Sequence, residues 1–195
     1  MNLTKLRVFF AIEIPEKQIT QISGLIRNSF APLNSSISWI KSSNLHITLK
    51  FLDELDQQHL TSLIKAISGN LTEFSSLSLK INGLGLFPES GKPRVLWIGI
   101  DKNPTLKSLT EMIEQQAHFL GYAKEHRRFS PHLTIGRVKH VLSKSDEIEL
   151  LKSVKNNLYV NFGQFEVNKL ILFKSTLLPT GAVYSPLAIF NLGKS

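Results

Sequence analysis

The tetrapeptide HITL at residues 46–49 recurs as HLTI at residues 132–135, and this repeated His-x-Thr-x pattern guides the interpretation of the whole chain. Each copy opens an apolar run of strand length, which a polar, turn-rich stretch precedes and a predicted helix follows. The copies lie 86 residues apart, from position 46 to position 132. Short solenoid repeats have periods of roughly 20–50 residues, so this spacing favours two related lobes.

The spacing within each copy has a physical meaning. Side chains alternate between the two faces of a strand, so residues i and i+2 share one face about 6.6 Å apart. His46 therefore shares a face with Thr48, and His132 with Thr134, while the apolar residues between them can enter a core. Two such strands side by side would line a cleft with two imidazoles and two hydroxyls.

These groups suit phosphoryl chemistry. An imidazole has an unperturbed pKa of ~6.5, so two of them can serve as a general acid and a general base near neutral pH. Threonine hydroxyls can donate hydrogen bonds to phosphate oxygens. Arg137 is the candidate cation for the negative charge of the transition state. An odd offset from His132 places Arg137 on the opposite face of a regular strand, so we expect a bend near Gly136.

Outside the two motifs, the sequence alternates irregularly between helical and strand patterns. This favours an α+β fold with mostly antiparallel sheets. Strands are expected at 7–14, 38–40, 46–52, 77–87, 94–100, 132–138, 164–175 and 182–191, and helices at 16–30, 57–71, 105–120 and 145–155.

Length and composition limit the classes of protein. The 195 residues, 42% of them hydrophobic, can bury a real core, and we expect one domain over residues 1–195, made of two lobes. Without cysteine, disulfides, thiolate nucleophiles and cysteine-ligated zinc are excluded. No apolar run suggests a membrane span or a signal peptide, so a cytoplasmic location is expected. The net charge of +8 is compatible with a polyanionic partner such as nucleic acid, or with a protein that is merely basic.

The same residues also allow interpretations other than acid–base catalysis. A single His-x-Thr in a strand is common by chance, and two histidines could also contribute to a zinc site. The other histidines (His59, His118, His126 and His140) are expected to be solvated or structural. The glycines at 83–87 lack a P-loop lysine pattern and favour a bulge or close packing. Trp39 and Trp97 could stack on a base, but core packing is expected for both.

With its flanking context, the chain resembles the 2H phosphoesterase superfamily, and within it the RNA 2′,3′-cyclic phosphodiesterase branch, also called the 2′-5′ RNA ligase family. The resemblance covers about residues 6–192. The stretches that carry it, in order, are RVFFAIEIP at 7–15, LHITLKFL at 45–52, GLGLFP at 83–88, PRVLW at 93–97, RFSPHLTIGRV at 128–138 and GAVY at 181–184.

The resemblance implies a bilobed α+β fold with pseudo-two-fold symmetry and a central cleft, and a reaction without metal or other cofactor. It implies that the partner is RNA ending in a 2′,3′-cyclic phosphate, which is opened to a 2′-phosphate. His132 would be the base that activates water, and His46 the acid that protonates the departing 3′ oxygen. Thr48, Thr134 and Arg137 would hold the phosphate. Members of the family can also join RNA ends through a 2′-5′ linkage, and a monomer is expected.

Two departures from the family pattern are present. Asp53 stands where glycine is common, and Gly136 where alanine is common. The negative charge of Asp53 near the first motif could weaken the binding of a polyanion. Two other functions remain open, namely a related 2H enzyme acting on another small cyclic or 2′-5′ phosphodiester, and an RNA-binding module without catalysis.

Overall fold

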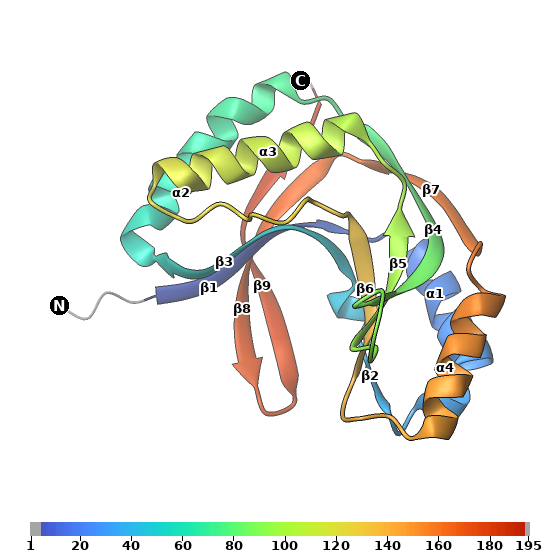
Figure 1. The fold of residues 1–195 in the computed structure, drawn as a ribbon. Helices are drawn as coiled ribbons and strands as arrows, with labels where there is room; N and C mark the ends of the chain where they lie inside the picture. The colour runs from blue at the N-terminus through green and yellow to red at the C-terminus, as the bar shows by residue number, and fades with distance from the viewer. Residues whose placement is uncertain (1–4, 194–195) are drawn as a thin grey trace.

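The structure is a computed structural model that describes residues 5–193, and its framework is one nine-stranded sheet with four α-helices (Figure 1). Every paired strand is antiparallel, which confirms the α+β prediction. The strands are β1 Lys5–Glu13, β2 Ile37–Trp39, β3 His46–Asp56, β4 Leu77–Phe87, β5 Val95–Ile100, β6 His132–Val138, β7 Asn161–Val167, β8 Lys169–Leu178 and β9 Gly181–Asn191. The helices are α1 Glu16–Ser29, α2 Gln57–Asn70, α3 Pro104–Phe119 and α4 Lys144–Asn156.

The strand order divides the sheet into two lobes at the junction of β3 and β6. The order is β7-β4-β5-β6-β3-β1-β8-β9, with β2 on β6. We call β3, β1, β8 and β9 the first lobe, and β2 with β6, β5, β4 and β7 the second lobe. Residues 46–49 lie in the first lobe and residues 132–135 in the second, so each lobe contributes one His-x-Thr-x strand.

The sheet must curve strongly, because the chain joins its distant strands with a single residue. Only Asn168 separates β7 from β8. These strands lie six positions apart in the sheet, which would be about 29 Å in a flat sheet at ~4.8 Å per strand. One residue spans at most ~3.6 Å. The prediction of a single strand over 164–175 is therefore wrong. The segment belongs to two strands, of which β7 pairs with β4 and β8 with β1.

The main core lies between the sheet and the helices, and each helix buries an apolar stripe. In α3 the buried side chains recur at helical spacing, from Leu106 through Leu109 and Ile113 to Ala117. The side chain of Asn103 accepts a hydrogen bond from the Leu106 amide (2.9 Å) and so caps this helix. A second, small apolar cluster lies on the other face of the first lobe and contains Phe9, Ala11, Ile171 and Phe173. Both faces of this lobe are therefore partly apolar, and only one is covered by helices.

The bulge and close packing expected of the glycines at 83–87 are confirmed. Gly83 has a φ of +68° at an irregularity in the β4–β5 register, and Gly85 lies directly under the ring of Trp97. Gly121, at +90°, follows the end of α3 and donates to the His118 carbonyl. Within residues 5–193, no helix is both long enough and apolar enough to cross a membrane.

Candidate active site

The two His-x-Thr-x motifs meet where the lobes join. The antiparallel register of β3 and β6 pairs Ile47 with Leu133, and both of these side chains are fully buried. The same register places His46 and Thr48 on one face, alongside Thr134 and His132 of the other strand. The predicted face with two imidazoles and two hydroxyls is therefore present, and all four of these residues are half-buried.

Each imidazole is held by the same local hydrogen bond. The Nδ1 atom of His46 lies 2.7 Å from the carbonyl oxygen of Asn44, and that of His132 lies 2.8 Å from the carbonyl oxygen of Ser130. A carbonyl can only accept, so Nδ1 is the donor in both rings. In the neutral state this leaves each Nε2 as an acceptor. The Asn44 side chain also donates to the Ala182 carbonyl (2.9 Å), which fastens the support of His46 to β9.

An aromatic wall supports each histidine. The ring of His46 lies 4.8 Å from that of Phe9 and 5.2 Å, edge-on, from that of Tyr184. The ring of His132 lies 5.1 Å from that of Phe87 and 6.4 Å from that of Trp97. Sequence reasoning did not assign these four aromatic residues to the site. The period-2 pattern of β5 could have placed Trp97 there, because Trp97 pairs with Thr134.

A β-bulge at the fourth position of each motif turns the following residues. Between β5 and β6 the register skips Ile135, and between β1 and β3 it skips Leu49. Each bulge shifts the alternation by one residue. Arg137 is thereby exposed on the face of His132, as expected from a bend, and Phe51 occupies the corresponding place in the first lobe. At Gly136 a Cβ would lie 2.8 Å from a side-chain carbon of Ile37, so this chain has no free space for the alanine common in the family.

The environment of His46 disfavours its charged form. Burial is the main cause that lowers the pKa of His46 below its usual range, and repulsion from Arg137, and from His132 whenever that ring is protonated, lowers it further. The bond to the Asn44 carbonyl acts in the opposite direction, because it favours the protonated ring.

A buried ion pair lies behind the first motif. Lys50 follows the bulge, and its Nζ donates to Oε2 of Glu114 (2.8 Å) on α3 and to the carbonyl of Ala123 (2.9 Å). The same Glu114 oxygen accepts the Glu125 amide at 3.3 Å. The side chain of Lys50 is 5% exposed and that of Glu114 17%. This pair therefore ties the first motif to the segment that leads into His132.

The remaining histidines lie outside the cleft. His59 is half-buried, and its Nδ1 lies 2.9 Å from the hydroxyl of Tyr122, whereas His118, His126 and His140 are exposed. Over residues 5–193, no three His, Asp or Glu side chains gather as metal ligands would. Trp39 packs edge-on against Phe30, as expected of a core side chain.

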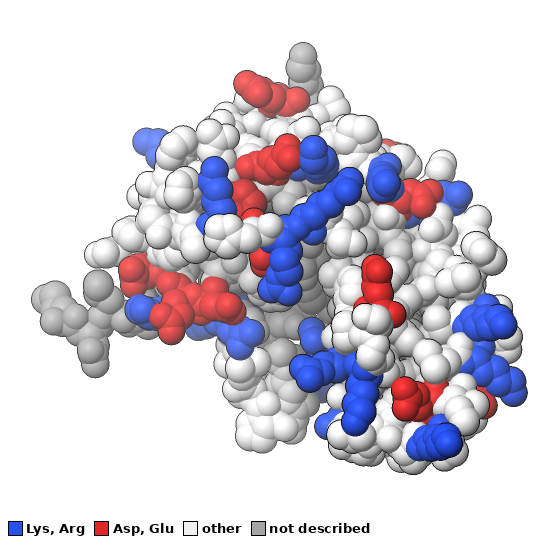
Figure 2. Space-filling model, in the orientation of Figure 1, with Lys and Arg blue, Asp and Glu red and all other residues white. Residues whose placement is uncertain are grey.

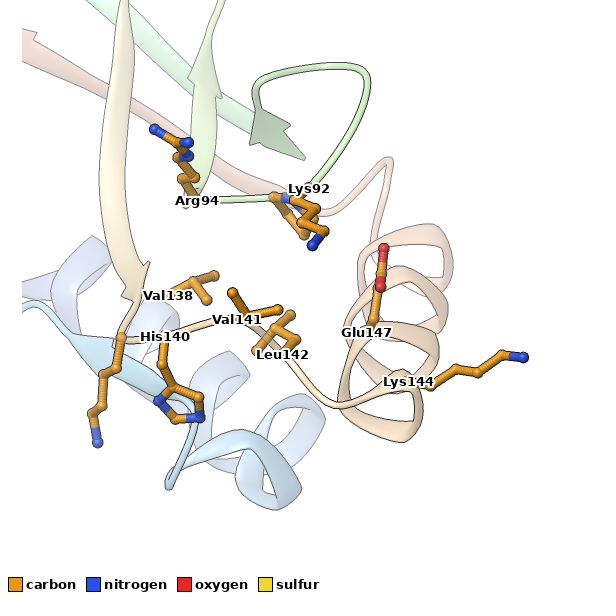
Figure 3. A pocket seen from close by; sticks show the side chains of 10 residues that line it. Lys92, Arg94, Val138, His140, Val141, Leu142, Lys144 and Glu147 are labelled. Atoms are coloured by element: carbon orange, nitrogen blue, oxygen red, sulfur yellow. The ribbon is translucent and has the colours of Figure 1, made fainter.

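Of two hollows on the described part of the chain, the larger does not contain the motifs. It measures about 440 Å³ and lies between the ends of β5 and β6 and the start of α4, with Lys92, Arg94 and Glu147 in its wall (Figure 3). The smaller, of about 240 Å³, is lined by His46 and Tyr184 together with the first-lobe strands. On the surface, Lys and Arg side chains stand around the recess between the β8–β9 hairpin and β6 (Figure 2).

Comparisons with known proteins place this geometry in a family. A model of the 2′-5′ RNA ligase superfamily matches residues 38–176. A relative from Methanocaldococcus jannaschii is 36% identical over 180 residues, which cover 92% of this chain and 96% of the relative. A relative from Aquifex aeolicus is 33% identical over 185 residues, covering 91% and 93%. Both relatives carry the name RNA 2′,3′-cyclic phosphodiesterase.

Solved structures share the fold. The crystal structure of Escherichia coli LigT complexed with 3′-AMP matches with a TM-score of 0.79 at 24% identity, over 98% of this chain and all of that one. The structure of TT0787 of Thermus thermophilus matches with a TM-score of 0.78 at 24% identity, over 96% and 98%. With the family model and the sequence relatives, these matches confirm the resemblance: the chain belongs to the 2′-5′ RNA ligase superfamily of 2H phosphoesterases.

Proposed function

We propose that this chain hydrolyses the 2′,3′-cyclic phosphate at the 3′ end of RNA to a 2′-phosphate, with His46 as the acid and His132 as the base. The observation that carries the proposal is the pair of imidazoles on one face of adjacent strands, each oriented through Nδ1 by a backbone carbonyl. Relatives named RNA 2′,3′-cyclic phosphodiesterase, one of them 36% identical, support this substrate.

The proposed reaction is balanced by two proton transfers. Nε2 of His132 takes a proton from water as its oxygen attacks phosphorus. The bond from phosphorus to the 3′ oxygen breaks, and Nε2 of His46 gives that oxygen a proton. The products are a 2′-phosphomonoester and a 3′-hydroxyl. No step calls for a metal ion, because both proton transfers and the neutralisation of charge are assigned to side chains.

The phosphate is held by the residues that share this face. Thr48 and Thr134 donate hydrogen bonds to its non-bridging oxygens. Arg137 carries the positive charge, and its fork of donors suits two phosphate oxygens at once. Removing one such stabilising group costs about 10²–10³ in kcat.

The lowered pKa of His46 makes its acid role depend on the substrate. In the free protein the neutral ring is favoured, whereas the acid must be protonated. An anionic phosphate beside His46 stabilises the imidazolium and raises its pKa. The substrate therefore helps to charge the acid that cleaves it.

Further parts of the proposal concern the protein's state. We propose that residues 1–195 act as one domain, because the two lobes share one sheet, and that the 22.0 kDa chain works as a monomer on RNA in the cytoplasm. The same groups can run the reaction backwards and join RNA ends through a 2′-5′ linkage. Light scattering after size exclusion tests the monomer.

The substrate assignment is tested by hydrolysis in EDTA. Three substrates are compared: an RNA pentamer ending in a 2′,3′-cyclic phosphate, a 2′-5′-linked dinucleotide and an ADP-ribose cyclic phosphate. The proposal expects the pentamer to be used with the highest kcat/KM and to yield only the 2′-phosphate. Preference for either other substrate would assign the cleft to a related 2H activity. Binding of the pentamer without turnover would indicate an RNA-binding module.

A further inference from the structure

The larger of the two hollows has a mainly cationic wall over an apolar floor (Figure 3). Its volume of about 440 Å³ falls in the range of roughly 300–1,000 Å³ that holds small ligands. Lysine and arginine side chains outnumber the single carboxylate of Glu147 in the wall. The floor consists of the side chains of Val138, Val141 and Leu142. This combination suits a ligand that has both an anionic group and an apolar part.

Two cations of the wall are available to an anionic ligand. Lys139 is already engaged, because its Nζ donates to two backbone carbonyls at 3.3 and 3.1 Å. The side chains of His140 and Lys144 point away from the centre of the hollow in Figure 3. Among the residues that the structure describes, neither Lys92 nor Arg94 has a carboxylate oxygen within 4.0 Å. Their charges are therefore not neutralised within the described part of the chain.

The hollow begins where β6 leaves the cleft. The Val138 amide donates to the Arg94 carbonyl (2.9 Å), and the next pair along the two strands is Val95 with Arg137. Because neighbouring residues of a strand point to opposite faces, Arg94 opens toward the hollow while Arg137 faces the cleft. Thr134 and Val138 are four residues apart, which is about 13 Å along a strand. A few nucleotides of RNA span that distance.

We propose that the larger hollow binds a nucleotide of the RNA upstream of the terminal cyclic phosphate. This rests on the proposed function, since the cyclic phosphate must lie in the cleft for the RNA to run past the end of β6. The guanidinium of Arg94 binds two oxygens of a backbone phosphate, and the Lys92 ammonium adds a second positive charge. Such contacts position the RNA without reading its sequence.

The carboxylate of Glu147 favours a ribonucleotide over a free phosphate ion. It lies opposite Lys92 across the hollow in Figure 3, where its charge opposes an isolated anion. A carboxylate accepts a hydrogen bond from a ribose 2′-hydroxyl, the group by which proteins distinguish RNA from DNA. The phosphate thus lies on the two cations and the ribose at Glu147, and the apolar floor covers the remaining sugar and base surface.

The test compares a dinucleotide and a pentamer of RNA, both ending in a 2′,3′-cyclic phosphate. Only the pentamer reaches the hollow, so the wild type should use it with the lower KM. K92Q/R94Q should lose most of this difference. Its slope of log KM against log[NaCl] on the pentamer should also fall by about 0.7 for each phosphate contact removed. The matched control is K65Q/K107Q, which removes the same charge from exposed positions on α2 and α3 and should keep the difference.

A chimaeric pentamer tests the contact to Glu147. It carries deoxyribose everywhere except in the terminal ribonucleotide that bears the cyclic phosphate. The wild type should have a KM about 2- to 12-fold higher for the chimaera than for the RNA pentamer, as expected for one hydrogen bond. E147L should use the two pentamers equally. Equal KM values in the wild type would overturn the assignment of the hollow to a ribonucleotide.

Two results with the charge variants overturn the proposal. One is that K92Q/R94Q keeps the wild-type ratio of KM between the dinucleotide and the pentamer. The other is that K65Q/K107Q loses this ratio to the same extent, because the advantage of the pentamer would then come from net charge alone.

A third variant examines the opposite end of β6. Arg127 and Arg128 are exposed in the segment before this strand. If R127Q/R128Q alone removes the advantage of the pentamer, the RNA leaves the cleft at that end and the proposal is wrong.

Failure of the proposed function gives a different result, because the wild type would then hydrolyse neither RNA. The hollow is in that case tested by fluorescence anisotropy with the 2′-phosphate pentamer. K92Q/R94Q must still raise Kd more than K65Q/K107Q does, and an equal Kd in both variants would overturn the site.

Discussion

Removal of the buried Lys50 amine should destabilise the protein far more than removal of an exposed one. Lys50→Met keeps most of the aliphatic stem but leaves the carboxylate of Glu114 without its ammonium partner. Breaking a buried pair from one side typically costs about 3–5 kcal/mol. For a chain of this size each kcal/mol corresponds to a shift in Tm of about 2–4 °C, so K50M should lower Tm by roughly 6–20 °C.

A matched control lies on α3, the helix that carries Glu114. Lys107 pairs with Glu111 at 3.4 Å, but the side chains are 70% and 63% exposed. Such a surface pair contributes about 0.3–0.5 kcal/mol, so K107M should leave the free energy of unfolding almost unchanged. A double variant, K50M with E114L, should recover most of the loss, because it removes both buried charges.

The measurement is urea unfolding followed by circular dichroism at pH 7 for the wild type and the three variants. Linear extrapolation gives the free energy of unfolding, and the slope should stay constant if all variants unfold in one cooperative step. A loss below about 1 kcal/mol in K50M would refute the reasoning. So would a double variant that is no more stable than K50M, because the cost would then come from lost packing and not from the unpaired charge.

Three further predictions concern the cleft. Arg137 lowers the pKa of His46, so R137Q should raise the pH at which the His46 ring of the free protein loses its proton, followed by NMR, while reducing kcat/KM by about 10²–10³; an unchanged His46 titration would contradict the electrostatic coupling of the two residues. A Cβ at Gly85 would lie 2.1 Å from the ring of Trp97, so G85A should cost about 1–3 kcal/mol in urea unfolding and lower kcat, and wild-type values of both would be the contrary result. Because the net charge is +8, kcat/KM on a long oligomer should fall more steeply with NaCl than on a cyclic mononucleotide, and equal salt slopes would argue against backbone contacts.

Most of the fold followed from local patterns. Where a polar stretch preceded an apolar run, as at His46–Asp56 and Leu77–Phe87, the start and type of the strand were predicted correctly, although the first strand continues to Asp56, beyond its predicted end at Leu52. The segment 164–175 failed because its two strands meet at a single residue, Asn168, which is too short a break to recognise in the sequence. The strands belong to opposite lobes, and that depends on long-range pairing.

The site shows the same division between local and long-range information. The common face of His46 and Thr48 follows from strand alternation, and the position of Arg137 followed from the same rule once a bend was allowed. The walls were not predictable, because Phe9 and Tyr184 reach His46 only through the pairing of distant strands. The burial of Lys50 was not predictable for a different reason: a bulge turns this charged residue of an apolar run into the core.

The central claim is that His46 and His132 act together as acid and base in one cleft. The most direct measurement is the single-turnover rate of hydrolysis of the cyclic-phosphate pentamer in EDTA, for H46A, H132A and the double variant, with the exposed His140→Ala as the control. The account predicts that each single variant loses about 10²–10⁴ in rate, and that the double variant loses much less than the product of the two. It also predicts that H140A is unchanged. A rate within tenfold of the wild type in H46A or H132A would contradict the account.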